Sequence, residues 1–358
     1  MSLSRRQFLT ISLCAIAGGG VLNSCARKAQ PPSSSTKQLN IYSWADYIHP
    51  QTIPEFEKRF GISVVYDTFA SNETLIAKFE AGAADYDVIV PSNYAVTKLI
   101  ELKHLQQIEK DRLPNFKFVM ERFQSPTFDP HCQYSVPYFF GTTGIAFNKT
   151  AFSSPADFPR DWDAFWDKRL AGRMTLLEDP RETIGLALKR RGYSYNCVEE
   201  QPIRLACQDL SRQKPLTMCY SSDQVIVYLS SGDSLQSLAY SGDALQARRA
   251  NPDIGYVIPE SGSSMWIDSM CIPATAPHVG NAHAWLNFML EPEIAAANAN
   301  FTYYATPNQA AMKLIKPELL HEKGLYPPES VLDGCDELAD IGTAIFLYDR
   351  MWTELKCI

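Results

Sequence analysis

The side chains most suited to chemistry in this sequence are carboxylates that stand next to aromatic residues or at expected element boundaries. Asp268 comes two positions after Trp266 and directly before residues 269–273, whose composition indicates a buried strand. A charge left unpaired in such a place is costly, so Asp268 is expected to have a partner. The polar residues before Trp266 also disfavour complete burial of its ring. We therefore expect Asp268 and Trp266 to contribute to a binding site.

A second group of acids, Asp179 and Glu182, flanks Pro180 and Arg181 at the expected start of a helix. Asp at the N-cap, Pro at the first helical position and Glu at the third make an acidic form of the capping box. Capping explains this spacing better than a pair of catalytic carboxylates does. The two roles are compatible, since Glu182 can point into a cleft while Asp179 caps the helix.

The sequence holds none of the motifs that the common catalytic and metal sites need. There is no G-x-S-x-G elbow, no H-E-x-x-H motif and no G-x-x-x-x-G-K phosphate loop. The six histidines are scattered, and the seven cysteines beyond Cys14 and Cys25 include no C-x-x-C pair. We expect a protein that is not an enzyme, uses no cofactor and binds no metal. No disulfide is assigned.

Residues 1–25 are typical of a twin-arginine or lipoprotein export signal. Arg5 and Arg6 form the arginine pair, and the apolar run 11–21 is too short to span a bilayer as a helix. Residues 22–25 (Leu-Asn-Ser-Cys) resemble a lipobox with an unusual Asn, in which Cys25 would receive the lipid. Plain cleavage nearby is the alternative. We predict a periplasmic or cell-envelope protein with a lipid anchor at Cys25.

Residues 26–38 contain prolines, serines and other polar residues but no bulky apolar side chain. Such a composition cannot bury a core, so this segment is expected to be a flexible tether. A tether suits a protein that moves between solution and a partner in the membrane.

The acidic balance of the chain limits its partners. Without residues 1–24, which contain two arginines and no acid, 31 basic residues stand against 40 acidic residues, a net charge of −9. An acidic exported protein is a poor candidate for nucleic acid and a reasonable one for a cationic ligand.

The pattern after the tether predicts an α/β architecture. Strand-like runs at 39–44, 62–69 and 87–90 alternate with helix patterns that begin near Ile53 and Ser71. Strand, helix, strand, helix and strand at this spacing indicate a doubly wound unit. An extended crossing run is expected next, over 134–148, followed by strands at 174–177, 237–240 and 254–258. A return crossing over 266–274 and a last helix over 337–356 complete the expected elements.

Two lobes joined by such crossings imply a hinge, and a cleft between lobes closes around a ligand. We predict lobe 1 over 39–143 plus 268–310 and lobe 2 over 144–267 plus 311–358. Each lobe is expected to be a doubly wound sheet with helices on both faces. This architecture predicts binding rather than catalysis.

Six landmarks, in order, resemble the spermidine/putrescine-binding proteins of bacterial ABC importers, which have the type II periplasmic-binding fold. They are 42–47 (Tyr-Ser-Trp-Ala-Asp-Tyr), 91–94 (Pro-Ser-Asn-Tyr), 179–182 (Asp-Pro-Arg-Glu), 240–243 (Tyr-Ser-Gly-Asp), 266–269 (Trp-Ile-Asp-Ser) and 304–308 (Tyr-Ala-Thr-Pro-Asn). The resemblance implies a polyamine ligand, permease subunits of an ABC importer as partners, and a monomer.

The resemblance also implies a set of ligand contacts. Aromatic contacts would come from Trp44, Tyr47, Tyr94, Tyr240, Trp266 and Tyr304. Carboxylates and hydroxyls would come from Asp46, Asp179, Glu182, Asp243, Asp268, Ser92 and Ser222. Asp268 would hold one terminal ammonium group, and Glu182 with Asp179 the middle or the opposite end. Both residue types suit a polyamine, because carboxylates pair with ammonium groups and aromatic faces tolerate charge beside methylenes.

The chain mixes the patterns of two kinds of relative. Asp46 and Asp243 match acids of putrescine-selective relatives, where spermidine-preferring relatives commonly have Glu and a non-acidic residue. Tyr240 stands where the family usually has Trp. Leu338 stands where a Gln contacts the ligand in spermidine binders. The resemblance therefore implies spermidine and/or putrescine without a choice between them.

A ferric ion or another cationic solute is the alternative ligand on the same fold. Tyr303 and Tyr304 resemble the adjacent tyrosine pair with which ferric-binding relatives hold iron. The context of residues 304–308 and the tryptophan-rich landmarks favour the polyamine group. A charge-transfer band between tyrosinate and iron would distinguish the two.

Overall fold

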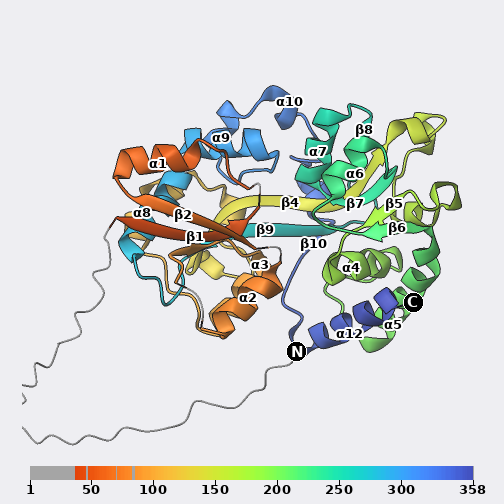
Figure 1. Ribbon diagram of the computed structural model, residues 1–358, viewed down its shortest axis with the longest axis horizontal. Helices are drawn as coiled ribbons and strands as arrows, with labels where there is room; N and C mark the ends of the chain where they lie inside the picture. The colour runs from red at the N-terminus through yellow and green to blue at the C-terminus, as the bar shows by residue number, and fades with distance from the viewer. Residues whose placement is uncertain (1–36, 46, 70, 83–84, 358) are drawn as a thin grey trace, which may run out of the picture. The chain divides into compact units, whose positions relative to one another are not determined.

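The computed structural model describes residues 37–45, 47–69, 71–82 and 85–357, which form a mixed α/β structure. These residues contain ten strands in one sheet, in the order β2-β1-β3-β9-β4-β7-β5-β6, with β8 paired to β4 and β10 to β9 (Figure 1). The predicted signal, its lipobox and nearly all of the predicted tether lie outside the described residues.

The strands are β1 (Gln38–Trp44), β2 (Ser63–Phe69), β3 (Val88–Ile89), β4 (Ser135–Asn148), β5 (Met174–Leu176), β6 (Thr217–Tyr220), β7 (Gln236–Tyr240), β8 (Ile254–Val257), β9 (Ser264–Cys271) and β10 (Asp336–Glu337). The helices are α1 (Thr52–Phe60), α2 (Asn72–Glu80), α3 (Asn93–Glu101), α4 (Pro180–Arg190), α5 (Glu200–Gln213), α6 (Val225–Ser231), α7 (Ser241–Ala250), α8 (Val279–Met289), α9 (Pro292–Thr302), α10 (Pro317–Leu320), α11 (Glu329–Leu332) and α12 (Ile345–Cys357).

The first half of the sheet is the strand–helix–strand–helix–strand unit that the sequence predicts. β1 lies between β2 and β3 and is parallel to both, with Gln38 opposite Ser63 and Ile41 opposite Val88. α1 ends at Gly61, whose left-handed conformation (φ 65°) stops the helix where its apolar pattern ends. Because β1 already includes Gln38, the predicted tether is one residue too long at its end.

The second half of the sheet is built around β5, which is parallel to β6 and β7. β7 in turn runs antiparallel to β4. A separate cluster of buried side chains packs here, among them Ile184 of α4, Leu238 of β7 and Tyr348 of α12. The sequence predicted strands at β5 and β7 but none at β6, and the periodicity of α12 places Tyr348 in the core.

Two long strands belong to both halves of the sheet. β4 is 14 residues long and buried throughout. Its first part pairs with β9, and residues 143–148 pair with β7 and β8. β9 returns antiparallel to β4 and meets β3 where Cys271 lies opposite Ile89. These strands occupy the two crossing runs expected from the sequence, so side chains on them can face elements of either half.

The segment that follows residue 310 packs on the side of β1 and α1. Ala311, Ile315 and Leu319 belong to the same buried cluster as Leu39 and Phe56. That cluster also contains Leu245 and Trp266, so it does not divide the chain into lobes. The lobe boundaries stay predictions.

The helix expected over 337–356 is shorter than predicted, since α12 begins only at Ile345. Gly342 has φ 55°, a left-handed conformation that a right-handed helix cannot contain. Residues before it form β10, which pairs in parallel with β9 at Asp336 opposite Ser264.

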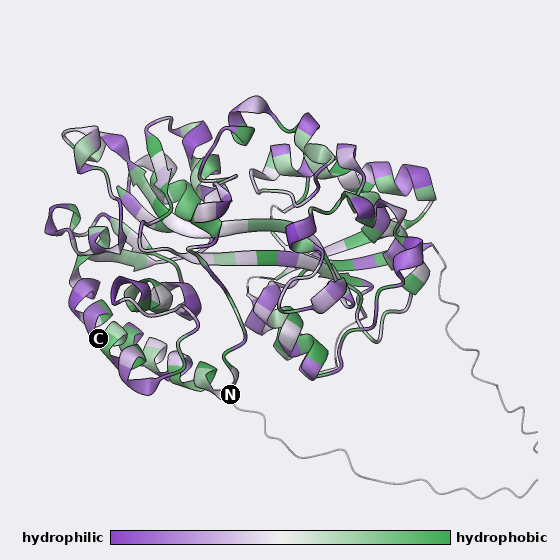
Figure 2. Cartoon of the chain, turned by 180° about the vertical axis from the view of Figure 1, so that it is seen from behind, coloured by the Kyte–Doolittle hydropathy of each residue, from purple (hydrophilic) through white to green (hydrophobic). Residues whose placement is uncertain are grey.

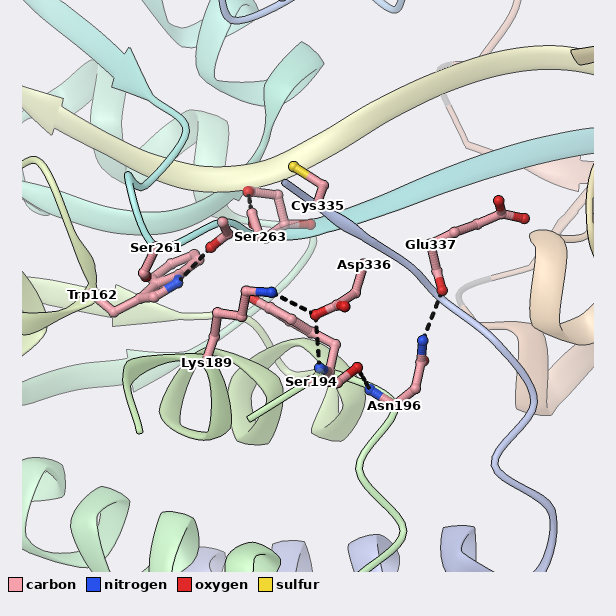
Figure 3. A network of polar contacts seen from close by, with 12 residues as sticks. Trp162, Lys189, Ser194, Asn196, Ser261, Ser263, Cys335, Asp336 and Glu337 are labelled. Carbon is pink, nitrogen blue, oxygen red and sulfur yellow. Dashed lines mark hydrogen bonds and ion pairs between the residues drawn. The ribbon is translucent and has the colours of Figure 1, made fainter. Parts of the chain in front are cut away.

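Side chains of the second half hold β10 in place (Figure 3). Lys189 Nζ lies 2.8 Å from Asp336 Oδ2, and Asn196 Nδ2 donates to the Glu337 carbonyl at 2.9 Å. These contacts hold the backbone of β10 extended. The next residue, Leu338, then reaches the cavity described below.

No helix in the described ranges is both long and apolar enough to cross a membrane. Figure 2 shows hydrophilic and hydrophobic residues side by side along the helices, as expected when only one helix face is buried.

Candidate ligand-binding site

A cavity of about 560 Å³ opens where the carboxyl ends of the parallel strands meet. Its lining includes residues just after β1, β2, β3, β5, β6 and β7, the edge at which α/β sheets bind ligands. Twelve of the predicted site residues line this cavity: Trp44, Tyr47, Ser92, Tyr94, Asp179, Glu182, Ser222, Tyr240, Asp243, Trp266, Asp268 and Tyr304. Asp46 lies outside the described residues.

Asp268 on β9 is held by two hydroxyl groups. Tyr47 Oη donates to its Oδ2 at 2.5 Å, and Ser92 Oγ donates to its Oδ1 at 2.6 Å. The residue is only 5% exposed. Burial raises the pKa of Asp268 to about 6, although both hydrogen bonds act to lower it. Because neither hydroxyl brings a positive charge, the carboxylate can still gain from a cationic partner.

An aromatic wall, formed by Tyr47, Tyr240, Trp266 and Tyr304, extends along the cavity. The Trp266 ring makes edge contacts with Tyr240 and Tyr304, with centroid separations of 5.9 Å and 5.5 Å. The Tyr304 ring also contacts the Tyr47 ring, with a centroid separation of 5.1 Å. The Nε1 of Trp266 is buried and has no hydrogen-bond partner among the described residues. These rings give the cavity a rigid apolar side next to its acids.

Two glycines make room for this wall. A Cβ atom at Gly141 would lie 2.4 Å from the Trp266 ring, and one at Gly242 would lie 2.4 Å from the Tyr304 ring. Real Cβ atoms do not approach other atoms so closely, so any side chain at either position would displace the ring above it.

The first turn of α4 combines capping with display of acids in the cavity, as the sequence suggested. Asp179 Oδ1 accepts from the backbone N–H groups of Arg181 and Glu182 at 2.8 Å and 3.1 Å. Asp179 Oδ2 receives a long hydrogen bond, 3.4 Å, from Tyr240 Oη. Glu182 is 1% exposed and accepts from Ser264 Oγ at 2.7 Å. Burial raises the pKa of both carboxyl groups, and their proximity raises that of Glu182 further.

Asp243 at the start of α7 accepts a hydrogen bond from Tyr304 Oη at 2.6 Å. Tyr304 therefore presents its ring to the cavity while its hydroxyl orients an acid. Burial and the charge of Asp243 raise the pKa of Tyr304 well above its ordinary value, so the phenol stays protonated and acts as the donor.

The cavity also contains residues that no sequence pattern singled out. Glu73, Glu178, Asp223 and Asn72 line it, as does Leu338, which the resemblance had already placed at a ligand-contact position. Glu73, Glu178 and Asp223 each follow a parallel strand by two to four positions, a signal that the topology could have supplied once the strands were known. In total the described lining holds seven carboxylates and seven aromatic rings, and no Lys, Arg or His.

The two adjacent tyrosines do not act together. Tyr304 lines the cavity, whereas Tyr303 is absent from the described lining and packs under Arg249, whose guanidinium lies 5.2 Å from its ring centre. Within the described ranges, no three side chains of His, Cys, Asp or Glu gather in a metal-binding arrangement. The separation of Tyr303 from Tyr304 disfavours the ferric alternative.

An α/β fold with an acidic, ligand-sized cavity at the strand ends is the architecture of a protein that binds a small solute. The family comparison agrees: the chain belongs to the bacterial extracellular solute-binding proteins, whose family model matches residues 51–322. This membership confirms the expectation of a solute-binding protein outside the cytoplasm rather than an enzyme.

Individual relatives resemble the chain over almost its whole length. It is 33% identical over 327 residues to a spermidine/putrescine-binding periplasmic protein of Salmonella typhimurium, covering 90% of this chain and 93% of the relative. A solved structure of a putative spermidine/putrescine ABC transporter from Listeria monocytogenes matches with TM-score 0.86 and 37% identity, over 89% and 99% of the two chains. A lipoprotein of Treponema pallidum matches with TM-score 0.80 and 32% identity, over 89% and 99%. These matches confirm the predicted resemblance and the periplasmic-binding-protein fold.

Proposed function

We propose that this protein captures a polyamine, spermidine and/or putrescine, in the acidic cavity and delivers it to the permease subunits of an ABC importer. The observation that carries this proposal is the described lining, which offers seven carboxylates and seven aromatic rings without a basic side chain. The names of the Salmonella and Listeria relatives support the same class of ligand.

The arrangement suits a chain of ammonium groups separated by methylenes. One terminal ammonium would pair with Asp268, and a second would pair with Glu182 and Asp179. The methylenes between them would lie along Trp266 and Tyr304, whose ring faces also attract the adjacent charge. Leu338 adds an apolar contact from the segment after β10.

The energies involved are of the order that binding requires. Charge-assisted hydrogen bonds contribute about 1.5–3 kcal/mol each, and cation–π contacts about 0.5–2 kcal/mol. A micromolar site requires about 8 kcal/mol net. Only toward the upper end of these ranges do three carboxylates with the aromatic wall exceed this and offset the entropy lost when a flexible ligand is ordered.

We further propose export by the twin-arginine signal and lipid attachment at Cys25, so that the protein works as an anchored monomer at the outer face of the membrane. The lipobox-like residues 22–25 and the composition of residues 26–36 support this. The lipoprotein nature of the Treponema relative, with its similar fold, is consistent with it.

Titration calorimetry of the purified protein with putrescine, spermidine, spermine and ferric ion tests the proposal. We expect saturable heat with at least one polyamine and none with iron. Heat from iron together with a visible charge-transfer band, and no response to any polyamine, would overturn the proposal. Lysine and arginine as added ligands test whether a single ammonium or guanidinium group suffices, which the spread of acids along the cavity disfavours.

A further inference from the structure

Asn72 is a polar residue in the cavity lining that the sequence analysis did not single out. It is the first residue of α2, a position at which side chains usually reach solvent, yet it is only 4% exposed. Its partners are Ser92 and Tyr94, and the N-cap of α2 is provided separately by Ser71, whose Oγ accepts from Thr74 N at 3.1 Å. Capping therefore does not explain why the Asn72 amide points inward.

The hydrogen bonds of Asn72 fix the orientation of its amide. The backbone N–H of Ser92 lies 3.1 Å from Asn72 Oδ1, and a backbone N–H can only donate. The oxygen must therefore face Ser92 N. Asn72 Nδ2 then faces two hydroxyl oxygens, Ser92 Oγ and Tyr94 Oη, both at 3.1 Å.

This orientation decides where the two hydroxyl protons point. Because Asn72 Nδ2 can only donate, both hydroxyls must accept from it and direct their own protons elsewhere. The partner left for Ser92 is Asp268 Oδ1 at 2.6 Å, and the partner left for Tyr94 is Glu73 Oε1 at 3.0 Å. Each carboxylate thus accepts a hydrogen bond from a hydroxyl group whose orientation is fixed by Asn72.

We propose that Asn72 is a positioning residue: it turns the Ser92 hydroxyl toward Asp268 and so keeps this carboxylate charged and ready for a cationic group. The role in ligand capture rests on the function proposed above, whereas the orientation of the hydroxyls does not. Both amide protons of Asn72 are already used, so its effect on Asp268 runs through Ser92, and the second lone pair of Oδ1 is what it can still offer an ammonium group directly.

The groups around Asp268 show why the hydrogen bond from Ser92 Oγ matters for its charge. Tyr47, from the segment after β1, and Tyr304, from the segment after α9, are the titratable groups that face it, and Asp243 of α7 lies behind Tyr304. None of these groups brings a positive charge, and the described lining has no Lys, Arg or His. In the ligand-free protein, hydroxyl donors are thus what opposes the cost of burying the Asp268 charge.

The first test needs no ligand. Carbon-13 NMR of the aspartate carboxyl carbons follows the titration of Asp268 in the purified full chain. We expect its midpoint to rise by about half a unit to one unit in Asn72→Ala, and by a similar amount in Asn72→Leu, which has nearly the shape of Asn but offers Ser92 Oγ no donor and adds no charge. Asn148→Ala is the matched control. Asn148 is equally buried and bonds to the backbone N–H and hydroxyl of Thr150, but it does not line the cavity.

The second test uses spermidine and putrescine as ligands at two pH values. We expect Asn72→Ala to weaken binding about threefold to tenfold at pH 6 and less than twofold at pH 8, where the carboxylate is charged in either protein. The pair Asn72→Ala and Ser92→Ala should be non-additive, because the first acts through the second.

The outcomes separate the two proposals. An unchanged Asp268 midpoint in both Asn72 variants overturns the positioning role, whether or not a polyamine binds. An equal loss of affinity at both pH values, or full additivity with Ser92→Ala, assigns Asn72 to direct ligand contact and also overturns it. A shifted midpoint without any polyamine binding to the parent protein supports the positioning role and rejects the proposed ligand class.

Discussion

Tyr47 and Asp268 are 221 positions apart in the sequence, yet their side chains share a hydrogen bond of 2.5 Å inside the cavity. The bond joins the segment after β1 to the crossing strand β9. It stabilises a buried carboxylate with a neutral donor and leaves the charge itself unpaired. A cation that enters the cavity therefore finds an acid that is already oriented.

Replacement of Asp268 by Asn should weaken polyamine binding by about 30- to 1000-fold, equivalent to about 2–4 kcal/mol. The change removes the charge but keeps the shape and one acceptor. Titration calorimetry measures the loss, and Asp253→Asn, at an exposed acid away from the cavity, is the control. Binding of every polyamine as tightly as by the parent protein would show that the site is wrong.

Affinity should fall as the pH is lowered through about 6, because protonation of Asp268 removes its charge. The raised pKa of Glu182 extends the dependence to higher pH. An ammonium group beside either carboxylate favours its charged form, so binding near pH 6 should release protons. Calorimetry in two buffers with different ionisation enthalpies measures this release. Identical heats in both buffers would contradict the proposed role of these acids.

The stability of the ligand-free protein should change with pH in the opposite sense. The pKa of Asp268 is raised in the folded state, so its contribution is most favourable below the ordinary value near 4 and is lost as the pH rises to about 6. Between these pH values, Asp268 changes the free energy of unfolding by about 2–3 kcal/mol. Asp268→Asn should remove that part of the dependence and make the empty protein more stable at pH 7. Denaturant unfolding at pH 4.5 and pH 7 tests this, and a less stable variant at pH 7 would contradict it.

Asp243→Asn distinguishes between the two polyamines. The acid is oriented by Tyr304 and matches the putrescine-selective pattern, so its loss should weaken putrescine binding about as much as the loss of Asp268 does. Spermidine, with a third ammonium group to engage other acids, should lose less. The ratio of the two affinities is the measurement, with Tyr304→Phe as a variant that keeps the acid but removes its donor. An unchanged ratio would mean that Asp243 does not select the ligand.

Cys25→Ser should release the protein from the membrane in soluble form, since the thiol at position 25 is the proposed site of lipid attachment. Mass spectrometry of the native N-terminus checks the modification directly. An unmodified N-terminus that begins elsewhere would reject the lipid anchor.

The sequence predicted the parts of this protein that local patterns determine. The alternation around β1, β2 and β3 and the buried run of β4 have apolar residues at strand periodicity, and the landmark motifs contain the cavity acids of α4, α7 and β9. Asn72 could not be found in this way, because its role depends on Ser92, 20 positions away on the next strand end. Glu73 and Asp223 likewise resemble ordinary surface acids until the strands beside them are placed.

The error at the end of the chain has a similar origin. Residues from 337 onward show a helical spacing of apolar side chains, but the left-handed Gly342 interrupts the helix, and Asp336, which is paired with Lys189 of α4, belongs to the short strand β10. A helical spacing of apolar residues indicates which side chains are buried. Leu338 is indeed buried, but it follows the strand β10 and is not part of a helix.

A Cβ atom at Gly141 would lie 2.4 Å from the Trp266 ring, so the space inside the cavity depends on a residue beneath its lining. A single methyl group on β4 would push the indole into the cavity and shorten the space for methylenes, and Gly242 offers the same adjustment under Tyr304. Two proteins with identical lining residues could thus prefer ligands of different lengths. In this chain the two glycines therefore offer a way to change the space beside Trp266 and Tyr304 without removing a single charge from the cavity.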